Sequence, residues 1–217
     1  MADHPLQYLV TRMQIGPENS LLRSTSESDA QAEQALLDHE AHGASIFSLF
    51  AVDILDEIRE RYGPVSAAAS AFETELIQRT VATKIGRSLE LYEHGDFDSC
   101  ASVLAPRLER VLRNVAGASG LTVTRSPDRR GRSGGVKGLG ELLILMEGAL
   151  PEQTRRYLKM LLSEVTGLNL RNRISHSLDD ETAQREAVLL IHCACHLRLL
   201  VPDEQPLPDG GGPRTGS

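Results

Sequence analysis

Apolar side chains recur every three to four positions along most of the chain, which is the period of an amphipathic helix. The recurrence predicts seven or eight helices, over residues 29–43, 45–62, 71–94, 96–115, 139–148, 151–166, 168–178 and 180–201. The second of these contains one row of large apolar residues spaced four apart, namely Ile46, Phe50, Ile54 and Ile58. Nothing alternates strand with helix, so the pattern predicts an all-α fold.

Local signals support several of these helix ends. Gly63-Pro64 stops the second segment, and Gly95 suits the C-terminal cap of the third. Asp96 or Asp98 is expected to cap the fourth, and Pro151 stands near the first turn of the sixth. Pro106 lies inside the fourth helix, where it predicts a kink.

The pattern also predicts how the chain is divided. Residues 1–27 have no sustained period, so we expect them to be irregular. Residues 202–217 carry too few apolar side chains to bury and are expected to form a disordered tail. Residues 28–70 are interpreted as accessory helices and residues 71–201 as the main helical domain.

Composition and charge narrow the function. The chain has 217 residues, of which only 4% are aromatic, and its net charge is −7. A protein that coats nucleic acid is usually basic, so a nucleic-acid partner would require a local basic patch. One glycine-rich loop, residues 117–138, supplies such a patch, and its candidate RNA-binding residues are Arg125, Arg129, Arg130, Arg132 and Lys137.

Cellular location follows from three absences in the sequence. The chain has no run of 18 apolar residues and no basic segment followed by an apolar run at its start, so we expect neither a membrane span nor secretion. Its three cysteines, Cys100, Cys193 and Cys195, are an odd number without framework spacing. We therefore expect a cytoplasmic protein.

Two motifs point only weakly to chemistry. His192 and His196 share a helix face, but Cys193 and Cys195 lie about 200° apart around the helix, so the four groups cannot converge on one metal ion. The glycine-rich loop lacks the Gly-Lys-Ser/Thr sequence of a phosphate-binding P-loop. We expect no metal and no cofactor.

A polar constellation in the seventh segment is more informative. Leu170, Ile174 and Leu178 form its core row, whereas Leu168, Asn172 and His176 form a second row about 160° away, with Arg171 beside it. A guanidinium binds a phosphodiester oxyanion, and an imidazole transfers protons near neutral pH. The Asn172–His176 spacing would allow the amide to orient the imidazole. An ordinary solvated helix face is the alternative interpretation.

The run Gly-Leu-Asn-Leu-Arg-Asn-Arg-Ile-Ser-His, residues 167–176, resembles the Arg-x4-His signature of HEPN domains in its Arg-Asn-x-x-x-His form. A second segment, residues 92–113, resembles the partner helix of an uncharacterised bacterial HEPN-like branch. The resemblance covers about residues 85–200. One departure is Ser177, because a small residue, commonly glycine, usually follows the histidine in this family.

The resemblance implies an up-and-down helical bundle, here with additional N-terminal helices, that dimerises through its motif helices. It further implies a metal-independent endoribonuclease of a toxin–antitoxin or phage-defence system, with RNA as substrate and an antitoxin as a possible protein partner. His176 would be the acid/base and Arg171 would bind the phosphate, while Asn172 would orient one or the other. Glu109 and Arg113 are candidate supporting residues, or a simple helix ion pair.

Two alternatives stay open at this point. A non-catalytic HEPN-like module could use the motif to bind nucleotides or proteins and to dimerise, and a plain helical interaction protein could match the motif by chance. Leu168, expected to point away from its own core, would fit a side chain that a second subunit covers.

Overall fold

The computed structural model describes residues 12–15, 21–25, 28–126, 134–176 and 181–201. Within these ranges the chain forms one 3-10 helix and seven α-helices, so the all-α class predicted from the sequence is confirmed. Two short antiparallel hairpins accompany them, β1 (Arg12–Ile15) with β2 (Leu21–Thr25) and β3 (Thr124–Arg125) with β4 (Gly135–Val136). The first hairpin lies in the segment that was expected to be irregular.

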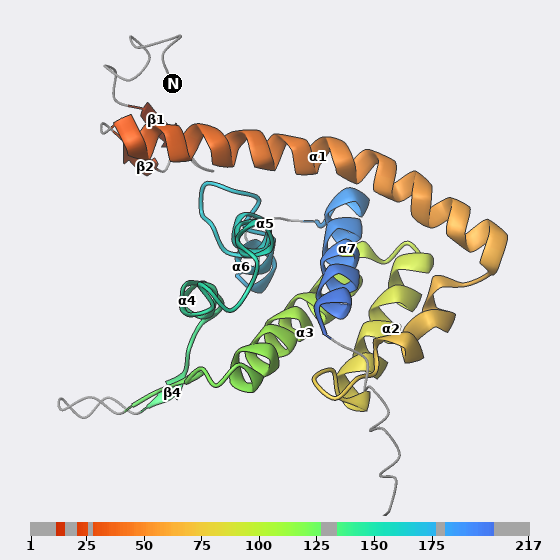
Figure 1. Ribbon diagram of the computed structural model, residues 1–217. Coiled ribbons are helices and arrows are strands. Elements are labelled where there is room, and N and C mark those ends of the chain that lie inside the picture. Colours follow the sequence, from red (N-terminus) through yellow and green to blue (C-terminus); the bar gives the residue numbers. More distant parts are fainter. Residues whose placement is uncertain (1–11, 16–20, 26–27, 127–133, 177–180, 202–217) are drawn as a thin grey trace, which may run out of the picture.

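A central helix, α3 (Phe97–Ala118), organises the core. It packs against α2 (Arg79–Glu93) and α7 (Gln184–Leu200), and its Leu104, Leu108 and Leu112 are at most 1% exposed. Five consecutive residues of α7, from 187 to 191, are also buried. A helix that is apolar on every side must be surrounded, and α7 therefore forms the second inner element of the bundle (Figure 1).

Three short helices complete the far side of α3. They are α4 (Leu139–Leu145), α5 (Glu152–Leu162) and α6 (Leu170–Ser175). Leu142, Leu158 and Leu170 anchor one helix each, because all three side chains are 0–1% exposed. The β3–β4 hairpin connects α3 to α4 and projects away from the bundle (Figure 1).

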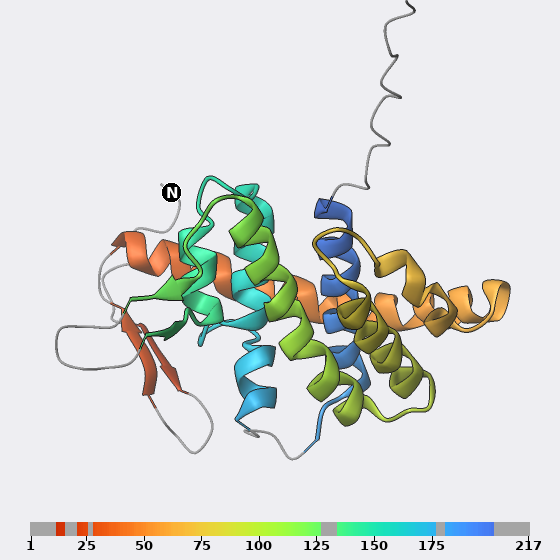
Figure 2. The ribbon, with the colours of Figure 1, turned by 90° about the horizontal axis from the view of Figure 1, so that it is seen from below.

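The structure corrects the prediction of two helices between residues 29 and 62, because they form one continuous helix, α1 (Ser28–Tyr62). It crosses α5 and α7 along one side of the bundle (Figures 1 and 2). Gly43 does not break it, since glycine inside a helix costs only about 0.5–1 kcal/mol. Buried residues on both sides of Gly43, Leu37 and Ala44, more than offset that cost.

The third predicted helix, residues 71–94, also differs from the structure. Its first part belongs to the 3-10 helix η3 (Val65–Phe72), and α2 begins only at Arg79. In the intervening turn the hydroxyl of Thr74 accepts a hydrogen bond from the backbone N–H of Ile77 at 3.0 Å. A fully buried Ile77 fixes this turn against the core. Local apolar spacing alone did not reveal the interruption.

Candidate functional site

The motif helix α6 begins two residues later than the sequence predicts, because its N-terminal junction has a special backbone. Asn169 adopts a left-handed conformation with φ of 50°, and it is the only non-glycine residue in the described ranges with a positive φ. The backbone N–H groups of Leu168 and Asn169 both donate to the carbonyl of Met160, at 2.9 and 3.4 Å. This junction fixes α6 to the end of α5, and the helix then packs against α3.

Arg171 is held in place by Glu109 on α3. Its Nε and Nη2 lie 2.9 and 2.7 Å from Glu109 Oε2. The other carboxylate oxygen of Glu109 accepts from Arg113 Nη2 at 2.6 Å. Since the Glu109 side chain is only 12% exposed, it shares one shielded negative charge between two guanidinium groups. The structure thus brings together three residues that the sequence analysis named separately.

Asn172 extends this network in a direction the sequence did not predict. Its Oδ1 accepts from Arg171 Nη1 at 3.0 Å, and its Nδ2 donates to Asn169 Oδ1 at 2.8 Å. Asn172 therefore orients Arg171 and stabilises the left-handed junction. The expected side-chain contact with His176 is not formed; the amide is turned toward Arg171 and Asn169 instead.

His176 stands at the C-terminal cap of α6, with an exposed side chain. Its backbone N–H donates to the carbonyl of Asn172 at 3.0 Å. No side-chain hydrogen bond to its imidazole is formed within the described ranges, and the next residues, 177–180, lie outside them. The ring is consequently accessible to a ligand.

Three further residues of this stretch are structural. Arg173 donates to the carbonyl of Leu168 at 3.3 Å and pairs with Glu186 on α7 at 2.9 Å, which ties α6 to the start of α7. Ile174 packs against the core, as its predicted row requires. Leu168 does so too, against the cluster of Leu37, Ala44 and Met160. The expectation that Leu168 points away from its own core is therefore wrong, because Leu168 precedes α6 and does not follow its period, whereas its cover by a second subunit stays a prediction.

The basic loop is only partly described. Arg129, Arg130 and Arg132 lie outside the described residues. Arg125 is exposed and its Nε donates to Glu141 Oε2 at 2.8 Å, and Lys137 Nζ donates to the carbonyl of Thr122 at 2.7 Å. Glu141 thus offsets the charge of Arg125. The β3–β4 hairpin begins beyond the C-terminal end of α3, whereas Glu109 lies in the middle of α3.

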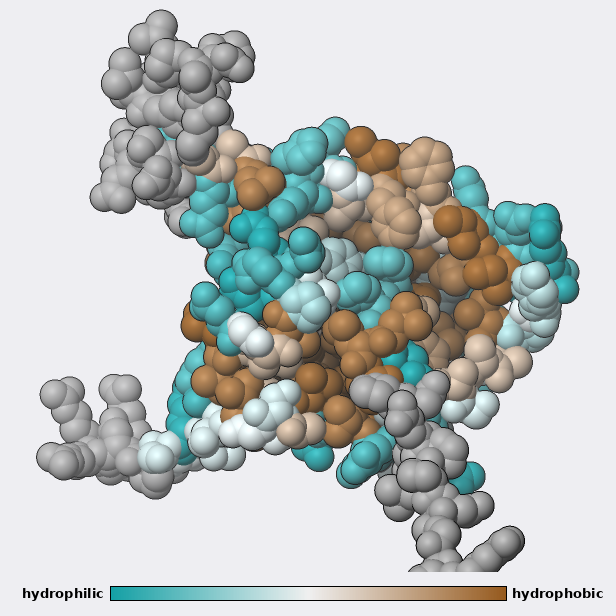
Figure 3. Space-filling model, viewed as in Figure 1, coloured by the Kyte–Doolittle hydropathy of each residue, from teal (hydrophilic) through white to brown (hydrophobic). Residues whose placement is uncertain are grey.

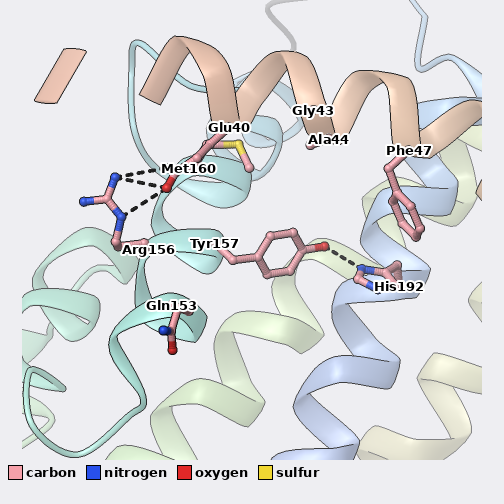
Figure 4. A pocket seen from close by; sticks show the side chains of 9 residues that line it. All are labelled: Glu40, Gly43, Ala44, Phe47, Gln153, Arg156, Tyr157, Met160 and His192. Atoms are coloured by element: carbon pink, nitrogen blue, oxygen red, sulfur yellow. Dashed lines mark hydrogen bonds and ion pairs between the residues drawn. The ribbon is translucent and has the colours of Figure 1, made fainter. Parts of the chain in front are cut away.

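A cavity of about 380 Å³ opens between α1, α5 and α7 (Figure 4). Its lining consists of Glu40, Gly43, Ala44, Phe47, Gln153, Arg156, Tyr157, Met160 and His192. At one end Arg156 Nε and Nη2 both lie 3.1 Å from Glu40 Oε1. At the other end Tyr157 Oη and His192 Nδ1 are 2.7 Å apart. The rings of Phe47 and His192 are arranged edge to face, with their centroids 4.9 Å apart.

Of the two histidines of α7, His192 lines this cavity and His196 lies next to it along the helix. The His192 and His196 rings are stacked with their centroids 6.3 Å apart, and Thr154 Oγ1 lies 3.3 Å from His196 Nε2. Burial, assisted by the neighbouring imidazole, lowers the pKa of His192. Burial raises the pKa of Tyr157. In the described part of the chain, no group of three or more metal-binding side chains could hold an ion.

Sequence reasoning missed this cavity, although His192 had been noticed. Its lining residues on α1 precede those on α5 and α7 by more than a hundred positions, and only the four-residue spacing of the two histidines was visible locally.

Among the described helices, none is long and apolar enough to cross a membrane. In comparisons with known proteins, no family model matches the chain, and no curated protein or solved structure matches it either.

Proposed function

We propose that this protein is a metal-independent endoribonuclease of the HEPN type, and one observation supports it most strongly. Arg171 is fixed by Glu109 and Asn172 through three of its five N–H donors, and the other two have no partner among the described residues. A guanidinium with a fixed orientation and free donors is suited to bind a phosphate. His176, with its accessible imidazole, ends the same six-residue helix.

The chemistry needs only these two groups and the RNA. His176 removes the proton from a ribose 2′-OH, the oxygen attacks phosphorus, and the bond from phosphorus to the 5′-oxygen breaks. The imidazolium formed at His176 then gives its proton to that leaving oxygen. Arg171 stabilises the negative charge that develops on the phosphate oxygens. The products are a 2′,3′-cyclic phosphate and a 5′-hydroxyl.

Further parts of the proposal concern the biological setting. RNA would reach the site with help from the basic residues of the 125–137 region. The protein would act in the cytoplasm as a toxin or a phage-defence nuclease, under the control of an antitoxin protein. A homodimer formed through the motif helices would bring two copies of Arg171 and His176 together.

A non-catalytic HEPN-like nucleotide- or protein-binding module is the second candidate, and one observation favours it. Glu109 neutralises much of the charge of Arg171, and Asn172 is turned toward Asn169 instead of His176. The same network would then serve to stabilise the fold and present the exposed face of α6 to a partner.

An RNase assay on the full chain with a labelled RNA and excess EDTA separates the two functions. For a nuclease we expect cleavage in EDTA, and we expect His176→Ala to lower the cleavage rate by a factor of about 10²–10⁴. Arg171→Lys keeps the positive charge but loses the planar guanidinium that can bind two phosphate oxygens at once, and it should also impair cleavage strongly. His94→Ala is the matched control, because His94 is likewise an exposed histidine at a helix C-terminal cap.

Each result decides between the candidates. Cleavage that falls in His176→Ala but not in His94→Ala supports the nuclease. Wild-type protein without cleavage, or His176→Ala with wild-type cleavage, refutes the catalytic assignment. Nucleotide binding by such an inactive protein, lost in Arg171→Lys, would instead support the binding module.

A further inference from the structure

The outer side of α1 carries large apolar side chains that the rest of the described chain does not cover. Ile46, Phe50, Ile54 and Ile58 are 46%, 60%, 49% and 37% exposed. Phe47, beside this row, is 37% exposed but lines the cavity and contacts His192. We call the four residues of the row the α1 stripe. Figure 3, in which α1 is seen from the side, shows apolar residues along its C-terminal half.

The opposite side of α1, which faces the bundle, buries several small side chains. In the middle of α1 the buried residues are small, with Ala44, Ser48 and Ala51 at 9% exposure or less. An ordinary surface helix buries its large apolar residues and exposes polar ones. In this part of α1 the largest apolar side chains are exposed instead, which is unusual unless something covers them.

The area of the α1 stripe corresponds to an interface. Side chains of this kind present roughly 150–250 Å² each when open, so the exposed fractions leave on the order of 400 Å² of apolar surface. Two copies would cover about 800 Å² between them, and apolar atoms make up roughly 60% of an interface. The complete contact would then bury about 1,300 Å², which lies within the range of stable interfaces.

The spacing of the row suits a second copy of the same chain. Ile46, Phe50, Ile54 and Ile58 are evenly spaced and therefore symmetric about position 52. Two antiparallel copies related by a twofold axis at that position place Ile46 against Ile58 and Phe50 against Ile54 of the partner. Every residue of the row then meets an apolar residue, as an isologous contact requires.

We propose that the α1 stripe is the interface of a twofold-symmetric homodimer in which two α1 helices pack antiparallel. This surface does not include α6, so it is an alternative to the assembly through the motif helices. The catalytic roles assigned to Arg171 and His176 of one chain do not depend on it.

Light scattering coupled to gel filtration tests the interface with the full chain at 1–100 µM. We expect the wild-type protein to be a dimer, and Phe50→Glu to raise its Kd by at least about 100-fold, because a charge enters an apolar contact. Ile144→Glu is the matched control, since Ile144 is 62% exposed on α4, a helix distant from the C-terminal half of α1. This variant should remain a dimer.

A mixing experiment tests the register. Ile54→Arg should be monomeric like Phe50→Glu, but an equimolar mixture of the two should dimerise. In that heterodimer Glu at position 50 meets Arg at position 54, and the native Ile54 meets the native Phe50. Circular dichroism should show native helix content in both variants, because both side chains are about half exposed in the single chain.

Several results would overturn the proposal. One is a wild-type monomer at 100 µM, which would assign the α1 stripe to a different protein or to a part of this chain outside the described residues. Another is a dimer that survives Phe50→Glu and dissociates in Ile144→Glu. A mixture that stays monomeric would refute the antiparallel pairing.

Discussion

Gly167 stands where no larger residue fits, and Gly167→Ala tests how the motif helix is positioned. A Cβ added at Gly167 would lie 2.4 Å from the carbonyl oxygen of Met160 and 3.1 Å from its carbonyl carbon. Both are backbone atoms, so a side-chain rotation cannot relieve the contact. The same carbonyl accepts the N–H of Leu168 at 2.9 Å, so the strain falls on the junction that starts α6.

The expected loss of stability follows from these contacts. The Cβ must move from 2.4 Å to at least 3.0 Å from the oxygen. Overpacking of this kind costs about 1–3 kcal/mol, and a weakened hydrogen bond adds up to about 1 kcal/mol. Alanine also restricts the unfolded chain, which offsets about 0.4–1 kcal/mol. We therefore expect Gly167→Ala to lower the free energy of unfolding by about 2 kcal/mol.

Urea unfolding followed by circular dichroism measures this change, and Gly43→Ala is the matched control. A Cβ at Gly43 meets nothing within 4 Å, and Gly43 lies inside α1. Alanine there should raise the free energy of unfolding by about 0.5–1 kcal/mol. If both variants shift stability in the same direction, the tight junction between α5 and α6 is not as the structure places it, and the orientation of Arg171 loses its basis.

Two further predictions concern charges inside the bundle. Glu109→Gln leaves Arg113 and Arg171 without their shared carboxylate and should lower the free energy of unfolding by about 2–3 kcal/mol in urea titrations. Glu57→Gln, on the exposed side of α1, should leave the free energy of unfolding nearly unchanged. Equal effects of the two variants would contradict the shielded network around Glu109. Because burial lowers the pKa of His192 below its ordinary 6.5, the neutral ring contributes stability that is complete above pH 6.5 and is lost as the pH falls toward the folded-state pKa. Thermal midpoints between pH 7.5 and 5.5 should therefore fall less steeply in His192→Asn than in wild type, and identical slopes would refute the assignment.

The sequence predicts those parts of the fold that depend on local chemistry. Asp96 caps α3 as expected, since its carboxylate accepts the N–H of Ser99 at 3.1 Å. Gly95 has a φ of 77°, which the predicted C-terminal cap requires. These signals depend on residues within one turn of each other, so no knowledge of tertiary contacts is needed to find them.

The sequence did not predict which face of α1 packs against segments that are distant in the chain. Periodicity placed Ile46, Phe50, Ile54 and Ile58 on one row, but it could not show that the small residues of α1 face the core instead. A small apolar face and a large apolar face give the same period. Only the close approach of α5 and α7 to α1 decides between them.

The candidate site was predictable to a similar degree. The resemblance named Arg171 and Glu109 in two separate helices, and their contact follows from the packing of α6 on α3. The role of Asn172 was not predictable, because it depends on the left-handed backbone of Asn169. An asparagine can adopt the left-handed conformation, but the residues next to Asn169 in the sequence do not predict that it does.

The position of α1 has a consequence for synthesis on the ribosome. Its inner face packs mainly on α7, yet α7 begins 122 residues after α1 ends. At about 5–20 residues per second, the nascent chain carries an uncovered α1 for on the order of ten seconds. During that interval both apolar sides of the helix are open to solvent. The folding of this protein in the cell therefore depends on what shields α1 until the last helix emerges.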